Sequence, residues 1–539
     1  MKRIFSIFLV GFAVVSANAQ TMYDAITLGT NDYFGTARSM SLNNAVTALG
    51  GDLGMIGINP AGAAVAPYSQ FVITPGITVS TTNASYTPEW GGNYTFANKV
   101  SKSRFIVPNV GASASFRTGN RSGLKGVTFS FVANSTNQFL SWGGVSGVND
   151  RTSLAMSFAN TANYDSDGNN HQLDPDVFQH FSNPWNDSSY GWNSLAGYKS
   201  NLFSYNDPMQ KFFGVTEDED GNLRGPLNQT SVTQVYGSKT DIVTGLAFNF
   251  NDKFYIGANI GIPTQNYTYD EQFSEQAKEM EQFPVKLGTQ GKFTTTYFDS
   301  SDYEYYYTAN IDGIYAKIGA IYLPTPGLRL GVAIQSPTLY TITERWETVI
   351  STKFQNSAVN ATASSPRGEY RYCFVSPYIV NAGAAFTLGT MGLVSADYEL
   401  TDYSIMHYSE LHDISAYYNA VNEDIRNYCG VSHQFRLGLE ANLSQTIALR
   451  AGYALRTSPE RFYNAEGWSY DKSLNVNSFS AGIGYASRKA FFVDAAARLT
   501  KYPVEHFEPY AQYYSTVASP DIAKDRHRLD ILLTFGWRF

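Results

Sequence analysis

The sequence predicts an all-β fold, a transmembrane antiparallel β-barrel of about 14 strands with an N-terminal hatch that plugs the lumen. Three observations predict it. The chain begins with an export signal, its composition suits a sheet with one apolar and one polar face, and its last strand alternates up to a terminal Phe539. Lipid-facing and lumen-facing residues alternate in this way along the strands of such barrels.

Residues 1–19 are typical of a signal peptide. Lys2 and Arg3 precede an apolar run, and the small-residue site Ala17-Asn18-Ala19 follows it. The run is too short for a membrane helix, which needs about 20 apolar residues, and no later stretch reaches that length. We therefore expect an exported mature chain that begins at Gln20.

The composition favours a membrane barrel over a set of soluble domains. Aromatic residues make up 15% of the chain and charged residues 16%, yet the mean hydropathy is −0.24. The net charge of −8 provides no basic patch for nucleic acid, so a nucleic-acid partner is excluded. The two cysteines, Cys373 and Cys429, are too few for a disulfide scaffold, and the sequence leaves open whether they pair.

From residue 70 onward, strands pair across tight turns. The first strand is 70–82, and the last ends the chain, with Ile531, Leu533, Phe535 and Trp537 on its apolar face. Its terminal Phe539 resembles the signal that the barrel-assembly machinery recognises in outer-membrane proteins. The pairs between them are 104–117 with 125–139, 238–250 with 253–270, 303–323 with 328–348, 366–386 with 393–404, 431–442 with 447–458, and 476–486 with 490–502.

Long connections alternate with these short turns. Because outer-membrane barrels have short periplasmic turns and long extracellular loops, we expect both mature termini in the periplasm. The longest connection, about 140–237, exceeds what a compact domain tolerates without structure or purpose. Residues 20–67 precede the barrel, which occupies 68–539, and they would lie in its lumen.

The stretch GTARSMSLNNAVTALGGDLGMIGINPAGAA (35–64) resembles the hatch of the FadL/TodX family of outer-membrane transporters for long-chain fatty acids and other hydrophobic compounds. Segments 313–337 and 376–404 also look like hairpins of this family. The resemblance implies passive uptake of a hydrophobic or amphipathic small molecule by a monomer in the bacterial outer membrane, in contact with its lipid. It also implies a substrate gate at the hatch motif Asn59-Pro60-Ala61, with Asp52 and Gly62 around it.

A second set of candidate residues lies in the 140–237 loop. Apolar groups on an exposed loop can mark a binding surface. In the resembled family such loops capture the substrate first; alternatively, these residues only pack the loop on itself. They are Leu154, Met156, Phe158, Leu195, Leu202, Phe203, Phe212 and Phe213.

A third set consists of charged residues that the strand alternation directs into the lumen. Buried charges of both signs are usually paired, so these residues either brace the barrel against the hatch or leave an arginine to receive a substrate carboxylate. They are Asp397, Glu399, Arg436, Glu440, Arg450, Arg456, Asp494 and Arg498.

Metal, haem and catalytic sites have weaker support. The segments DSDGN (165–169) and DEDGN (218–222) are shorter than a calcium loop of the EF-hand type, and Asp-Gly is a common turn. Met406, His407 and His412 offer haem ligands, but no haem-attachment motif is present. We expect no cofactor and no metal, and the absence of hydrolase and phosphate-binding motifs argues against an enzyme.

The sequence thus predicts an outer-membrane channel for hydrophobic compounds. A barrel that binds or adheres through its large loops is the alternative, with haemin binding as a variant. The resembled family can release substrate sideways at a kinked early strand. Because the strand 125–139 has no proline and only Gly126, the sequence leaves open whether release is sideways or into the periplasm.

Overall fold

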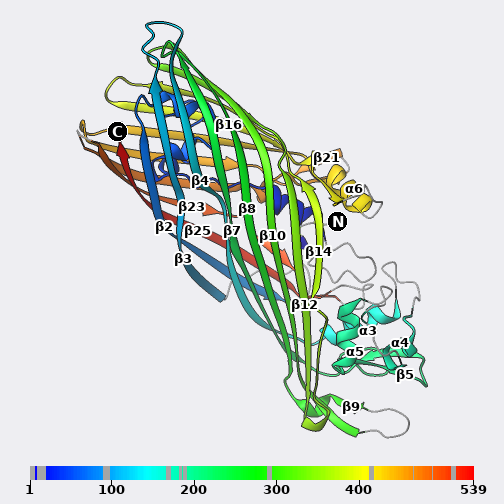
Figure 1. Ribbon diagram of the computed structural model, residues 1–539. Helices are drawn as coiled ribbons and strands as arrows, with labels where there is room; N and C mark the ends of the chain where they lie inside the picture. The colour runs from blue at the N-terminus through cyan, green and yellow to red at the C-terminus, as the bar shows by residue number, and fades with distance from the viewer. Residues whose placement is uncertain are drawn as a thin grey trace.

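The computed structural model describes residues 7–8, 20–88, 98–164, 172–180, 185, 191–287, 294–411, 418–464, 467–487, 490–510 and 518–539. Its main feature is a closed antiparallel barrel of 14 strands (Figure 1). The ring closes because the first strand, β2 (Gln70–Thr87), pairs with the last, β25 (Asp521–Arg538). The predicted fold class is confirmed.

Eleven strands of the ring, including β2 and β25, are continuous. Several run beyond their predicted ends, because the sequence pattern weakens where the strands leave the apolar band described below. The other nine are β3 (Asn98–Arg117), β4 (Leu124–Asn149), β7 (Leu227–Phe250), β8 (Phe254–Ala277), β10 (Thr294–Thr325), β18 (Val431–Asn442), β19 (Ile447–Arg456), β22 (Val476–Ala486) and β23 (Phe491–Lys501).

Three further strands are each broken into two halves. Two of the breaks fall at Ser336-Pro337 and Ser376-Pro377, where proline has no N–H group to continue the ladder. The Ser376 hydroxyl accepts the N–H of Thr338 at 2.9 Å and so keeps the neighbouring strands joined. The halves are β11 (Leu328–Gln335) with β12 (Leu339–Phe354), β15 (Ile379–Thr387) with β14 (Gly368–Val375), and β16 (Gly392–Asp402) with β17 (His407–Glu410).

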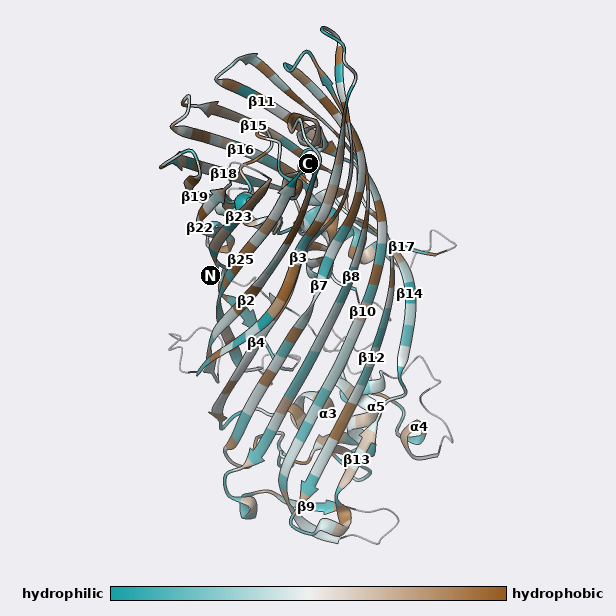
Figure 2. Ribbon diagram, turned by 60° about the vertical axis from the view of Figure 1, so that its left-hand side comes forward, coloured by the Kyte–Doolittle hydropathy of each residue, from teal (hydrophilic) through white to brown (hydrophobic). Residues whose placement is uncertain are grey.

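Apolar side chains form a band around the outside of the barrel, seen in Figure 2 as brown segments on the upper strands. In β25 the residues Ile531 and Leu533 are exposed, whereas Asp530 and Thr534 on the other face are buried. This alternation matches the prediction and the face that lipid contacts. Beyond the band the outer faces turn polar, as in β10, where Glu304, Asn310 and Asp312 are exposed.

The barrel therefore has two different ends. We call the end with the short turns, next to Gln70 and Arg538, the turn end, and the opposite one the loop end. The strands β7, β8, β10 and β12 extend past the apolar band toward the loop end (Figure 1). Among the described residues, no helix has the length and apolar character to span a bilayer.

Residues 20–67 lie inside the barrel as short helices and turns (Figure 1, blue). They are α1 (Met22–Gly29), α2 (Ala37–Ser41), η1 (Leu53–Met55) and η2 (Pro60–Val65). Each begins at a residue whose side chain accepts a backbone N–H, a pattern that satisfies the free donors of a helix start. The four caps are Thr21, Thr36, Asp52 and Asn59. We call this segment the hatch.

The described residues of the segment 152–224 fold into a small unit at the loop end, which we call the loop domain. It comprises α3 (Leu154–Asn163), α4 (Pro175–His180), α5 (Trp192–Lys199), β5 (Phe203–Asn206) and β6 (Lys211–Gly214). Its apolar core continues into inward-facing residues of β8, β10 and β12, namely Phe273, Tyr303 and Ile350. The long connection therefore has a fold of its own, docked on the barrel wall.

Shorter elements complete the described residues. The strands are β1 (Ile7–Phe8), β9 (Pro284–Leu287), β13 (Ala361–Ser364), β20 (Arg461–Asn464), β21 (Gly467–Tyr470) and β24 (Glu505–Phe507). The helix α6 (Asn419–Tyr428) and the turns η4 (Met280–Gln282), η5 (Ser357–Val359), η6 (Tyr403–Ile405) and η8 (Lys472–Leu474) belong to connections.

Candidate functional site

The motif Asn59-Pro60-Ala61 joins the hatch to the barrel wall. Asn59 is 1% exposed, and its Oδ1 accepts the N–H of Ala61 at 3.0 Å. Its Nδ2 donates to the carbonyl of Thr47 at 2.7 Å and to that of Ala320 in β10 at 3.2 Å. One side chain therefore caps η2 and ties two hatch segments to a strand.

Glycines on the inner face of the wall make room for this contact. A Cβ atom built on Gly319 would lie 2.1 Å from Asn59 Oδ1, and one on Gly257 would lie 2.4 Å from the Pro60 carbonyl carbon. Such distances leave no space for a side chain. Five more glycines, on other strands of the wall, also lie close to hatch residues 41–48: Gly331, Gly383, Gly438, Gly452 and Gly482. We call the seven the glycine girdle.

Asp52 and Gly62, the other predicted gate residues, hold the hatch together. Asp52 accepts the hydroxyl of Thr36 at 2.8 Å and the N–H of Gly54 at 2.7 Å. Gly62 faces Gly50 so closely that a Cβ atom on it would lie 3.1 Å from the Gly50 Cα. The five predicted gate residues are thus packed within the hatch and, at Asn59 and Pro60, against the inner wall; whether they act as a gate stays a prediction.

Two chains of ion pairs link the hatch to the wall. In the first, Arg38 of the hatch pairs with Glu440 at 3.2 Å, and Arg450 pairs with Glu440 at 2.6 Å and with Asp494 at 2.5 Å. In the second, Asp32 of the hatch pairs with Arg528 and, at 3.2 Å, with Arg498; both arginines also pair with Asp530 at 3.1 Å. These buried charges compensate one another.

The remaining predicted lumen charges also reach a partner. Glu399 and Arg436 pair at 2.8 Å. Asp397 accepts the N–H groups of Val46 and Thr47 of the hatch, each at 2.7 Å, and Arg456 donates to the Asn31 carbonyl at 3.1 Å. All eight residues face inward, and their contacts join wall strands to one another or to the hatch; a role of one arginine in binding a substrate carboxylate stays a prediction.

Sequence reasoning missed several members of this network. Arg38 and Asp32 were absent from the prediction because the hatch has no strand alternation from which to assign a direction. Arg528 was also missed, although it lies on the same face of β25 as Asp530 and the period of two would have found it.

The predicted capture residues lie in the core of the loop domain. Leu154, Met156, Phe158, Leu195, Leu202, Phe203 and Phe212 are all buried, with at most 3% of each side chain exposed, and Phe213 is half-buried. In this arrangement they pack the domain on itself and on the wall, which was the alternative interpretation. A role in capture stays a prediction.

The weaker candidates offer little. Cys373 and Cys429 are both free thiols. In DEDGN, Asp218 Oδ1 accepts the N–H groups of Asp220 and Asn222, which is a turn, and the described residues contain no metal-binding group of three or more histidines, cysteines or carboxylates. DSDGN and His412 lie outside the described residues. Met406 is buried against the hatch, and the ring of His407 contacts its own loop at the Ile405 carbonyl.

The barrel wall has a split between β3 and β4. Pairing of the two strands ends at Asn109 and Asn134, although β3 continues to Asn98 and β4 to Asn149. Pro108, next to the last paired residue Asn109, has no N–H group that could continue the pairing. On the other strand, β4 carries one extra residue between Ser135 and Asn137. The strand 125–139 has no proline, as the sequence shows, but its neighbour β3 has one at Pro108. We call this region the β3–β4 split.

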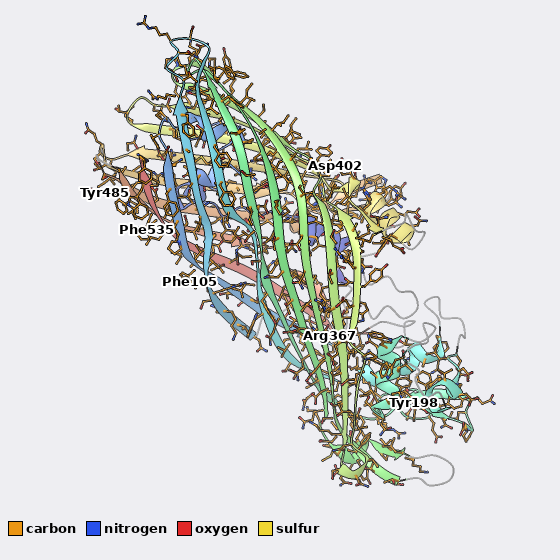
Figure 3. All side chains as sticks on the ribbon, in the orientation of Figure 1. Phe105, Tyr198, Arg367, Asp402, Tyr485 and Phe535 are labelled. Atoms are coloured by element: carbon orange, nitrogen blue, oxygen red, sulfur yellow. The ribbon has the colours of Figure 1, made fainter. Side chains whose placement is uncertain are left out.

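The hatch meets the wall at the split. The N–H of Asp32 donates to the Thr136 carbonyl at 2.6 Å, and the N–H of Phe34 donates to the Ser135 carbonyl at 3.1 Å. Hatch backbone therefore bonds to the edge of β4 at Ser135 and Thr136, next to the last residue that pairs with β3. On the β3 side, Phe105 points outward from the wall (Figure 3) and is 67% exposed.

A comparison with solved structures identifies the fold. A FadL homologue from Pseudomonas aeruginosa matches with a TM-score of 0.50 and 12% identity, over 95% of this chain and 100% of that one. The chain has the FadL fold. The resemblance read from the hatch sequence is confirmed at this level.

Further barrels with the FadL fold are similar over most of the chain. The Pseudomonas putida toluene transporter TodX has a TM-score of 0.49 and 12% identity, over 94% of this chain and 99% of that one. The Ralstonia pickettii toluene transporter TbuX has a TM-score of 0.44 and 15% identity over the same shares. No protein-family model and no curated protein matches the sequence.

Proposed function

We propose that this protein is a passive channel of the bacterial outer membrane for hydrophobic or amphipathic small molecules. The observation that carries the proposal is the β3–β4 split next to the hatch. On the turn-end side of the split, the glycine girdle and the ion pairs hold the hatch against the wall, and we infer that the hatch closes the lumen there. At the split, the two strands have lost their hydrogen bonds to each other.

This arrangement favours a sideways exit. A molecule that enters at the loop end meets the hatch and leaves through the split, between Phe105 and Val107 of β3 and the edge of β4. Both side chains are exposed at the level of the apolar band, so an apolar molecule passes from the lumen to lipid without crossing water. In this orientation the turn end and both termini face the periplasm.

The substrate class rests on the fold and on chemistry. Structures with this fold include a FadL homologue and toluene transporters, so long-chain fatty acids and small aromatic hydrocarbons are the first compounds to test. We further propose that the chain acts as a monomer, contacts outer-membrane lipid, and is inserted by the barrel-assembly machinery through its last strand.

A deletion of Thr136 tests the route. It removes the extra residue of β4, so the strand can pair with β3 in register and close the split. We expect uptake of labelled oleate or toluene, by cells that lack their own transporter, to fall at least fivefold. Thr136→Ala, which loses only the bond from the Thr136 hydroxyl to Asp241, should keep most of the uptake.

A deletion of Lys125 is the second control, because it removes the other extra residue of β4, next to the short turn. If both deletions lower uptake equally, the split is not the route. If the wild-type protein is folded at the surface and transports neither compound, the channel proposal fails for both classes. The second candidate function, surface binding through the loop domain, then gains support from the compact fold of that domain.

A further inference from the structure

The inner wall between the hatch and the loop domain carries a band of aromatic side chains. Tyr269 lies opposite Tyr307, which lies opposite Trp346, on the adjacent strands β8, β10 and β12. All are half-buried on the inner face of the wall, so part of each side chain stays exposed there. We call the set the tyrosine band: Tyr267, Tyr269, Tyr305, Tyr307, Trp346 and Tyr370.

Carboxylates accompany the band. Glu271 faces Tyr305 across the strand pair and accepts the hydroxyl of Tyr269 at 3.2 Å. Glu344 accepts the hydroxyls of Tyr307 at 3.0 Å and Tyr372 at 3.2 Å. Asp24 on α1 is near enough to interact electrostatically with Tyr305, Tyr307 and Glu344.

These carboxylates differ from those around the hatch. Glu399, Glu440, Asp494 and Asp530 all pair with arginines, whereas no ion pair within the described part of the chain includes Glu271 or Glu344. Glu344 instead receives the side-chain amide of Gln20 at 2.6 Å. The hydrogen-bond partners of Glu271 and Glu344 are therefore neutral donors rather than cations.

The basic residues closest to the band are engaged elsewhere. Lys524, which interacts electrostatically with Glu271, donates to Thr233 at 2.7 Å and lies over the ring of Phe507. Arg526 pairs with Glu505 at 3.4 Å and lies over the ring of Tyr502. Lys239, opposite Gln265, likewise donates to the Leu28 carbonyl at 3.3 Å and to Asn31 at 2.9 Å, so each of these three basic residues already has partners of its own.

An unpartnered side chain supports a ligand site here. Gln265 lies on the inner face of β8, two positions before Tyr267, and is 2% exposed. Neither its amide oxygen nor its amide nitrogen has a hydrogen-bond partner. A buried amide without partners costs about 1–3 kcal/mol in general, so a ligand group that bonds to Gln265 would offset that cost.

We propose that the tyrosine band with Glu271 and Glu344 binds hydrophobic amines, with the ammonium group at the carboxylates and the apolar body against the rings. Aromatic faces attract cations, and carboxylates accept their N–H donors. The inference rests on the proposed channel function and names a substrate class for it. Free fatty acids would be disfavoured, because an ammonium group brings N–H donors to the oxygens of Glu271 and Glu344 and a carboxylate does not.

Binding to the purified barrel in neutral detergent tests the proposal. The probes are phenylbutylamine, phenylbutyrate and phenylbutanol, which share one apolar body and differ only in the polar group. By calorimetry we expect the amine to bind at least tenfold more tightly than the acid. Glu344→Gln should weaken amine binding about tenfold and leave phenylbutanol binding within twofold.

Glu304→Gln is the matched control, because Glu304 lies on the outer face of the same sheet. It should leave all three affinities unchanged, and Glu271→Gln replaces Glu344→Gln if that variant does not fold. Equal binding of amine and acid, or an equal effect of Glu304→Gln, would overturn the proposal. Uptake of phenylbutanol by cells distinguishes a failure of the proposed substrate class from a failure of the proposed channel function. If phenylbutanol is taken up but the protein does not prefer the amine, only the substrate class fails. If phenylbutanol is not taken up, the channel function fails.

Discussion

At the scale of single residues, Asn59 does the most for the hatch, because its amide is a donor and an acceptor at once. Asn59→Ala removes the bonds to Ala61, Thr47 and Ala320 and leaves buried groups without partners. Each such group costs about 1–3 kcal/mol. We expect faster hydrogen exchange across residues 59–64 in the folded barrel, measured by mass spectrometry.

Asn356 provides the control for this change. It caps the turn η5 with the same bond, from the N–H of Ala358 to its side-chain oxygen at 3.1 Å, but it is exposed and far from the hatch. Asn356→Ala should leave hatch exchange unchanged. Unaltered exchange in Asn59→Ala itself would show that the wall contacts alone hold η2.

Glu217 makes the loop domain sensitive to pH. Its carboxylate is buried and accepts the N–H of Gly214, and burial raises its pKa from 4.5 to about 7. The folded domain therefore binds this proton more tightly than the unfolded chain. Its stability is highest below pH 4.5 and falls as the pH rises to about 7, by up to about 3 kcal/mol.

Proteolysis of the loop domain in the intact barrel measures this effect. We expect slower cleavage near pH 5.5 than near pH 8, with Glu217→Gln showing a smaller difference because its amide does not titrate. The exposed Glu219 offers a matched control, since Glu219→Gln should keep the wild-type pH dependence. A wild-type rate that does not change with pH would contradict the prediction.

At the scale of elements, the glycine girdle explains how hatch and wall fit. An alanine at Gly319 would place its Cβ 2.1 Å from Asn59 Oδ1, and overpacking of this kind costs about 1–3 kcal/mol. We expect Gly319→Ala to lower the temperature at which the barrel unfolds in detergent. Gly126→Ala, whose new Cβ would lie 3.4 Å from its nearest neighbour, should have a much smaller effect.

The strands were more predictable than the contacts between them. The period of two gave the strand positions and the inward direction of residues such as Asp397 and Arg498, because burial on one face imposes it. It did not reveal the glycine girdle, because the sequence pattern does not show whether a glycine is needed for a turn or for close contact with another part of the backbone. Nor did it reveal the split, which depends on Pro108 and an extra residue on different strands.

Sequence patterns could not predict the burial of the apolar residues in the loop domain, for a different reason. Its apolar residues were noticed, but a short helix such as α3 cannot show whether its apolar side chains face water or a neighbour. Here the neighbour is the inner wall, through Phe273 and Tyr303. Tertiary packing, not local sequence, determined that these residues are buried.

At the scale of the whole molecule, the two candidate functions, transport and surface binding, predict different roles for the barrel and the loop domain. Asn149 of β4 pairs directly with Leu227 of β7, so both ends of the loop domain meet at one point of the wall. A short Gly-Ser linker can therefore replace residues 152–224 without straining either strand. We expect this variant to fold, as shown by heat-dependent migration on gels.

Uptake by the same variant then separates the functions. The hatch, the glycine girdle and the β3–β4 split do not depend on the loop domain for the contacts described, so a channel should retain at least about half of its uptake. Loss of uptake in a folded variant would assign substrate capture to the loop domain. If uptake persists but the cells no longer retain a partner that the wild type binds, surface binding is a separate function of that domain.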